Sequence, residues 1–214
     1  SKTYGTYLSS SNGNDDEFKI DKIWYSFPVG ERNTFWVGPK IENYYMHGAT
    51  PSIYSPITKQ FKLGGNGAAY GASTDSGVGW AYKADNGFSV SSNVVSKQNG
   101  SAKGFLTDEA KTNWSNQVAY TTDKYHVSLI SALKYNGWTD SYYTTSLGKK
   151  RPDGNSTNYG LRAYWRPDSD SQVVPEISGG YDISTVDGQD AETDAYFLGL
   201  TWKDQFQADD KIGL

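Results

Sequence analysis

The chain contains no cysteine, and this absence excludes a disulfide framework and any metal site built from thiolates. It has only two histidines, His47 and His126, which lie far apart in the sequence. A zinc site is therefore not expected. Four acidic residues lie close together near the C-terminus: Asp187, Asp190, Glu192 and Asp194. Their spacing is not that of a calcium-binding EF-hand. We therefore expect a solvated acidic loop, and we expect neither a metal nor a cofactor.

Long apolar runs are also missing, because no segment approaches the roughly 20 consecutive apolar residues of a transmembrane helix. A membrane protein is still allowed, since a β-barrel strand faces lipid with only every second residue. The formal net charge of −4 is spread over the 214 residues without a basic stripe, which argues against nucleic acid as a partner. The 23 glycines and 17 tyrosines fit a barrel, and a secreted β-sandwich shares most of this composition.

The clearest pattern is the alternation in residues 125–135, Tyr-His-Val-Ser-Leu-Ile-Ser-Ala-Leu-Lys-Tyr. Successive side chains of a strand point to opposite faces. One face of this stretch is thus apolar, with Tyr125 and Tyr135 at its ends, and the other is mostly polar, with Ile130 as the misfit. At about 3.3 Å per residue and a tilt of about 40°, the stretch spans about 25 Å, the height of the apolar band of an outer-membrane barrel. A soluble sandwich strand more often has about five or six residues.

The same alternation recurs along the chain. Two β-rich runs, 20–27 and 34–41, are joined by a short turn at 28–33 and predict a hairpin. A second hairpin is predicted around residues 85–87, Asp-Asn-Gly, because asparagine and glycine supply the positive φ angles of tight turns. Further strands bring the expected total to about ten, antiparallel throughout: they fall within 114–120, 125–135, 159–166, 173–183 and 195–203.

The predicted connections alternate in length. The short ones cover 28–33, 85–87, 121–124, 167–171 and 204–210; the long ones cover 42–76, 97–113, 136–157 and 184–193. Such alternation is typical of an up-and-down barrel with brief periplasmic turns and long external loops. The longest connection, 42–76, is expected to fold inward and narrow the channel, since loops of this length without structure of their own are uncommon unless they are functional.

Aromatic rings also fall near strand ends on the apolar parity, as in the interfacial belts of membrane proteins: Tyr120, Tyr125, Tyr135, Tyr159, Trp165, Tyr181 and Trp202. We therefore predict an all-β fold, an antiparallel up-and-down transmembrane β-barrel forming a single domain over 1–214. The chain has no initiator methionine, and 211–214 read as a strand just beginning. We expect it to be a processed or truncated piece of a longer polypeptide.

Two motifs stand out near the N-terminus, KIWYSFPVGER at 22–32 and FWVGP at 35–39. LGGNGAAYG at 63–71 and DNGFS at 85–89 add weaker signals. Together they make the chain, from about residue 19 onward, resemble the major outer-membrane porins of cyanobacteria, which are related to carbohydrate-selective porins and often labelled iron-uptake porins.

The resemblance implies a porin in the cell outer membrane that assembles as a homotrimer. In that family a surface-layer homology domain and a helical segment precede the barrel, and this sequence shows neither. About ten strands also fall short of the roughly sixteen of such a barrel. The resemblance therefore implies a fragment of a larger barrel.

Such a pore passes small polar solutes and inorganic ions by diffusion, without catalysis. Polar side chains on the parity away from lipid are the expected pore lining: Lys83, His126, Ser128, Lys134, Arg162, Arg166, Glu176 and Asp182. A wet lumen tolerates any polar side chain. A sharper hypothesis is that Arg162, Glu176 and Asp182, on adjacent strands, set a transverse field across the pore.

Two other functions compete with the porin. A secreted β-sandwich would bind carbohydrate through Trp138, Tyr142 and Tyr143, and would bury between two sheets the aromatics that a barrel shows to lipid. His126 and Ser128 are spaced like the His-x-Ser pair of outer-membrane phospholipases. Alternate residues on one strand face lie about 7 Å apart, however, and this pair is on the polar parity. We interpret both as lumen residues and predict that the protein is not an enzyme.

Overall fold

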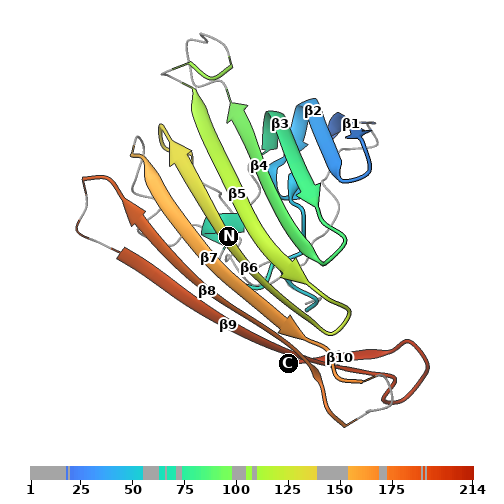
Figure 1. Ribbon diagram of the computed structural model, residues 1–214. Helices are drawn as coiled ribbons and strands as arrows, with labels where there is room; N and C mark the ends of the chain where they lie inside the picture. Colours follow the sequence, from blue (N-terminus) through green and yellow to red (C-terminus); the bar gives the residue numbers. More distant parts are fainter. Residues whose placement is uncertain are drawn as a thin grey trace.

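The computed structural model describes residues 18, 20–54, 63–65, 67–70, 74–97, 105–107, 110–138, 154–168, 173–188, 190 and 192–214. They form one sheet of ten strands whose spatial order follows the chain from β1 to β10. Figure 1 shows this sheet as a continuous curved wall with β1 and β10 at its opposite edges. The predicted all-β, antiparallel up-and-down topology is confirmed. A closed barrel is not shown, because β1 and β10 do not pair with each other.

Each strand pairs antiparallel with the next, and most are long enough to cross an apolar band. Their bounds are β1 Ile23–Val29, β2 Asn33–Glu42, β3 Thr74–Lys83, β4 Phe88–Lys97, β5 Lys111–Thr121, β6 Tyr125–Tyr135, β7 Ser156–Trp165, β8 Glu176–Val186, β9 Glu192–Lys203 and β10 Lys211–Gly213. Two single-turn helices lie between β2 and β3: η1 Asn43–Met46 and α1 Gly67–Tyr70. Neither helical segment in the described ranges has the length or the apolar character needed to span a bilayer.

The predicted stretch 125–135 forms β6 over its whole length and pairs with both β5 and β7. Its side chains alternate between exposed and buried as the sequence predicts. Tyr125, Leu129 and Tyr135 are 48 %, 54 % and 38 % exposed, whereas His126 and Ser128 between them are buried.

The prediction of strictly alternating connections is wrong at the C-terminal end. It holds through β7, but the connection 166–175 between β7 and β8 is longer than 187–191 between β8 and β9. The reason is that polar residues extend this hairpin: Thr185 pairs with Glu192, and Asp194 pairs with Ile183. Backbone hydrogen bonding continues through these residues although their side chains lack the apolar signal of a strand.

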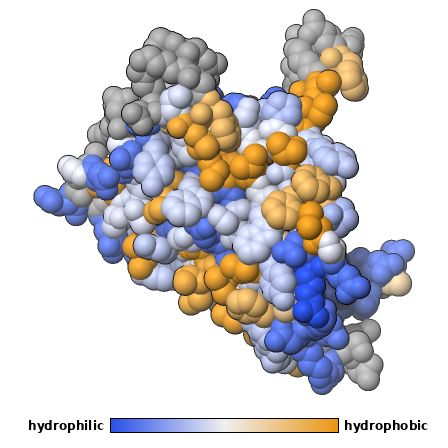
Figure 2. All heavy atoms as spheres, turned by 45° about the horizontal axis from the view of Figure 1, so that its top comes forward, coloured by the Kyte–Doolittle hydropathy of each residue, from blue (hydrophilic) through white to orange (hydrophobic). Residues whose placement is uncertain are grey.

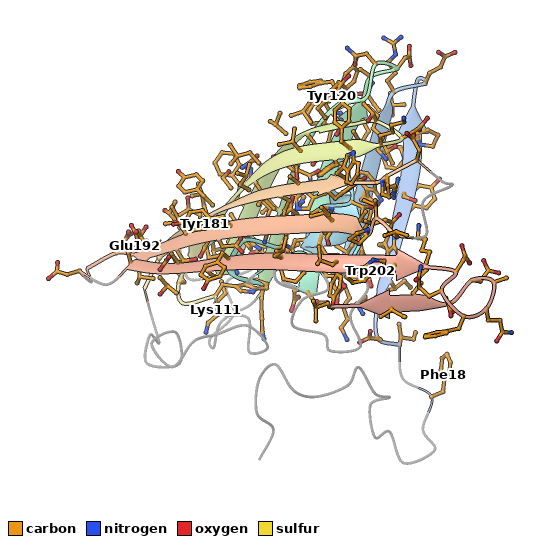
Figure 3. The ribbon with its side chains drawn as sticks, turned by 90° about the horizontal axis from the view of Figure 1, so that it is seen from below. Phe18, Lys111, Tyr120, Tyr181, Glu192 and Trp202 are labelled. Atoms are coloured by element: carbon orange, nitrogen blue, oxygen red, sulfur yellow. The ribbon has the colours of Figure 1, made fainter. Side chains whose placement is uncertain are left out.

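The two faces of the sheet differ in character. One, which we call the apolar face, carries most of the exposed large apolar side chains, among them Val78, Trp114, Val118, Tyr125, Leu129, Tyr135, Tyr159, Leu161, Trp165, Tyr181 and Leu198. Figure 2 shows apolar residues spread over the molecular face in view, with hydrophilic residues gathered at one end. Figure 3 shows Tyr120 and Tyr181 standing away from the ribbon, and Glu192 and Trp202 at opposite ends of β9.

The opposite face, the polar face, is covered by the described residues between 43 and 70, which we call the covering segment. Helix η1 contacts β2, β3 and β4, and α1 contacts β6, β7 and β8. Only two small apolar clusters form between segment and sheet. In the first, Met46 packs with Ile41, Val95 and Trp138.

The second cluster explains the apolar misfit in the pattern of β6. Ile130 is fully buried on the polar face, where it packs against Ala69 and Tyr70 of α1, with Leu63 beside them. It therefore serves as the apolar contact point for the covering segment.

Candidate functional site

The polar face under the covering segment is organised around a buried ion pair between neighbouring strands. Arg162 of β7 directs its Nη2 to both carboxylate oxygens of Asp182 on β8, at 2.8 and 3.0 Å. The two side chains are 0 % and 1 % exposed. Burying charges in this way is tolerated only where they are paired and hydrogen-bonded.

The same guanidinium also holds the covering segment. Its Nε donates to the carbonyl oxygen of Leu63 at 2.8 Å, and its Nη1 donates to the carbonyl of Leu161 at 3.0 Å. The Tyr70 ring of α1 lies 5.1 Å from the Arg162 guanidinium carbon, in a cation–π contact. Arg162 thus joins β7, β8 and the covering segment at one point.

Glycines allow the backbone of the segment to approach this pair. A Cβ on Gly65 would lie 2.5 Å from an Asp182 oxygen, and a Cβ on Gly180 would lie 1.9 Å from the carbonyl oxygen of Gly64. Gly64 itself has a φ of +73°, which side chains rarely allow. Close contact with the sheet therefore explains Gly64 and Gly65 of the 63–71 motif.

A second anchor lies at Gln117 on β5. Its Nε2 donates to the Tyr70 hydroxyl at 2.8 Å and to the Ala49 carbonyl at 2.9 Å, and its Oε1 accepts from the Ala49 amide at 3.0 Å. One amide side chain therefore holds two parts of the covering segment. Sequence reasoning identified neither Gln117 nor Tyr70, because a glutamine on the polar parity looks like any other lumen residue.

His126 and Ser128 are closer than strand geometry predicted. The side chains lean toward each other, so that His126 Nε2 lies 2.8 Å from Ser128 Oγ. The other ring nitrogen, Nδ1, lies 2.7 Å from the hydroxyl of Thr121, and the ring stacks on Tyr164. A hydroxyl group therefore positions the histidine, whereas a carboxylate does so in the catalytic triads of nucleophilic enzymes. The serine is also buried.

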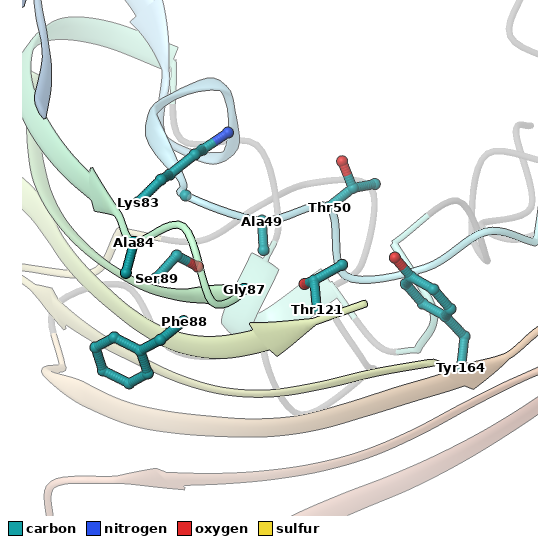
Figure 4. Close-up of a pocket in the computed structure, with 10 residues that line it drawn as sticks. Ala49, Thr50, Lys83, Ala84, Gly87, Phe88, Ser89, Thr121 and Tyr164 are labelled. Carbon is teal, nitrogen blue, oxygen red and sulfur yellow. The ribbon is translucent and has the colours of Figure 1, made fainter. Parts of the chain in front are cut away.

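A cavity of about 320 Å³ opens beside this histidine, close to the short turn between β3 and β4. Thr50, Ser89, Thr121 and Tyr164 contribute its hydroxyls, and Lys83 contributes a cation, as Figure 4 shows. Its chemistry suits hydrated polar solutes, because it presents several hydrogen-bonding groups and one charge.

The predicted grouping of Arg162, Glu176 and Asp182 is only partly realised. Arg162 and Asp182 pair, but Glu176 binds Lys203 at 2.6 Å and lies 3.6 Å from Arg166. These three form a partly exposed cluster at the short-turn end of the sheet. Lys134 is buried on the same polar face, near the opposite end of β6.

His47 in the covering segment adds a titratable anchor. Its Nδ1 lies 3.1 Å from Ser91 Oγ, its Nε2 is buried without a hydrogen-bond partner among the described residues, and its ring meets the Tyr70 ring edge-on. Burial disfavours the imidazolium and lowers the pKa of His47 from 6.5 to about 3.

We predict that acidification loosens the covering segment. A released His47 takes up a proton below pH 6.5, whereas the docked one does so only near pH 3. Docking therefore loses stability as pH falls through that window, by about 2 kcal/mol at pH 5. Protease cleavage within the segment, measured from pH 7 to pH 4, should increase, and His47→Asn should flatten the dependence. An unchanged dependence in this variant would contradict the assignment.

Of the three residues expected to bind carbohydrate in a sandwich, the structure describes only Trp138. Trp138 is buried against Ile41 and Met46, so it offers no stacking surface. Tyr142 and Tyr143 lie outside the described residues. Within the described ranges, no group of three His, Asp or Glu side chains is placed to hold a metal ion. No protein-family model, curated protein or solved structure matches this chain.

Proposed function

We propose that the chain forms part of the wall of an outer-membrane pore through which small polar solutes and inorganic ions diffuse. The observation that carries the proposal is the apolar face, whose large side chains the described residues leave exposed. A soluble protein rarely exposes so extended an apolar surface, whereas a membrane wall requires it. Tyrosines at both ends of β6 correspond to the two interfacial belts that such a wall presents.

The polar face supports the same proposal. Six of the eight predicted lining residues are buried on it, and the covering segment lies against it through the Arg162 and Gln117 anchors. In a barrel this segment narrows the lumen, so its docking sets the conductance. The cavity at Lys83 and Thr121 then lies along the route. The proposed pore needs neither catalysis nor a cofactor. We also propose that it assembles as a trimer, because the sequence resembles the trimeric cyanobacterial porins.

A soluble carbohydrate-binding sandwich is less well supported. It needs a second sheet over the aromatic face, and the described strands all belong to one sheet. Only the shared composition favours it.

Reconstitution of the protein into planar bilayers tests the proposal. We expect discrete ohmic conductance steps that decrease as the ions in the salt become larger. A protein that dissolves in plain buffer and inserts into no membrane from detergent would contradict the pore.

A further inference from the structure

A row of polar side chains interrupts the apolar face near its middle. Ser92 of β4 pairs in register with Asn116 of β5, which pairs with Ser131 of β6. All three are partly exposed on the face that otherwise carries apolar residues. Along β6, Ser131 lies between Tyr125 and Tyr135. At about 3.3 Å per residue, it is about 20 Å from Tyr125 and about 13 Å from Tyr135. The row is therefore deep within the proposed membrane band.

The hydrogen bonds within this row leave one group unsatisfied. Ser92 Oγ donates to Asn116 Oδ1 at 2.7 Å and accepts from Trp114 Nε1 at 3.0 Å. Asn116 Nδ2 carries two further N–H donors, and these make no hydrogen bond to the described part of the chain. In hydrocarbon such donors cost free energy, because no water is present to accept from them.

From this row we infer that the wall formed by β4, β5 and β6 faces a second copy of the chain in the membrane. This inference rests on the proposed pore, because the same row facing water would be unremarkable. A partner copy supplies what lipid lacks: its own asparagine amide offers both an acceptor and donors. The serines on either side of Asn116 are small, which lets two backbones approach closely, as at helix contacts in membranes.

The neighbouring side chains fit a packed contact. Val118 and Leu129 lie beside the row toward the short turn, and Trp114 and Leu133 lie beside it toward the long loop. The amide thus sits inside an apolar surround, where a hydrogen bond to a partner is shielded from water. Elsewhere, β7 and β9 present Leu161 and Leu198 near their middles, which suits contact with lipid.

Association of copies tests the amide directly. We expect Asn116→Leu to weaken association in detergent roughly tenfold, the loss of one intramembrane hydrogen bond, as measured by native mass spectrometry across a dilution series. Leu198→Val, a change on β9 away from the row, should leave association unchanged. Unaltered or tighter association of Asn116→Leu would overturn the inference.

Spin labels then locate the contact. Because the chain has no cysteine, Ser131→Cys and Leu198→Cys each introduce a single labelling site. In lipid vesicles we expect the label at 131 to be shielded from membrane-dissolved oxygen and the label at 198 to be accessible to it. Equal oxygen access at both positions would overturn the contact while leaving the pore intact. Labels at both positions that meet water-soluble relaxants and not lipid would contradict the pore itself.

Discussion

Asp182→Ala releases the covering segment and raises the single-channel conductance of the reconstituted protein. The substitution leaves the fully buried Arg162 guanidinium without its carboxylate. Removing one partner from a buried pair typically costs about 3–5 kcal/mol. The protein recovers part of this cost by letting Arg162 reach water, which requires it to give up its hydrogen bond to Leu63. Release of the segment from the wall is the expected result.

Two companion variants separate this effect from a general loss of charge. Asp168→Ala removes an exposed carboxylate whose partner, Lys124, is exposed as well, so we expect almost unchanged stability and unchanged conductance. Arg162→Met combined with Asp182→Leu removes both buried charges and should recover most of the stability in a denaturant titration. An Asp182→Ala protein with native conductance and native stability would contradict the anchoring role of the pair.

The strands were predictable because a half-buried strand records its environment residue by residue. In β6 most apolar side chains lie on the apolar face and most polar ones on the polar face, with Ile130, Ser131 and Ala132 as the exceptions, so the alternation gives both its bounds and its faces. The hairpin at 85–87 was equally predictable, because its Asn-Gly dipeptide favours positive φ angles, and Gly87 does have a φ of +92°. The β8–β9 hairpin was harder to predict, because its outer end consists of threonine and acidic residues, which are typical of loops.

The covering segment was predictable in existence and not in detail. Its length between β2 and β3 indicated an inward fold, but its contacts depend on residues far apart in sequence, such as Leu63 with Arg162. The choice of ion-pair partner was also not predictable. Arg162 pairs in register with Gly180, and its long side chain reaches Asp182, two residues away along β8, whereas Glu176 lies four residues away. No local pattern encodes that reach.

A second large increase in conductance is expected when a single methyl group is added at Gly180. A Cβ on Gly180 would overlap the carbonyl oxygen of Gly64 at 1.9 Å, far inside van der Waals contact. Gly180→Ala therefore forces the covering backbone away from β8 by more than 1 Å, since contacts of this kind need about 3.4 Å. Overpacking of this kind costs about 1–3 kcal/mol. We expect higher conductance and faster cleavage of the segment by protease, with the charges of the Arg162–Asp182 pair retained.

The adjacent residue provides the matched control. Gly179 precedes Gly180 on β8 and points to the apolar face, where a Cβ would meet only the Phe197 carbonyl at an ordinary 3.6 Å. Gly179→Ala changes strand composition and backbone entropy as Gly180→Ala does, but leaves the covering segment untouched. Opposite results from neighbouring alanines would show that conductance depends on how closely the segment lies against the wall. Equal conductance in both variants would mean that the segment does not limit the pore, because the only difference between them is which face of β8 gains the methyl.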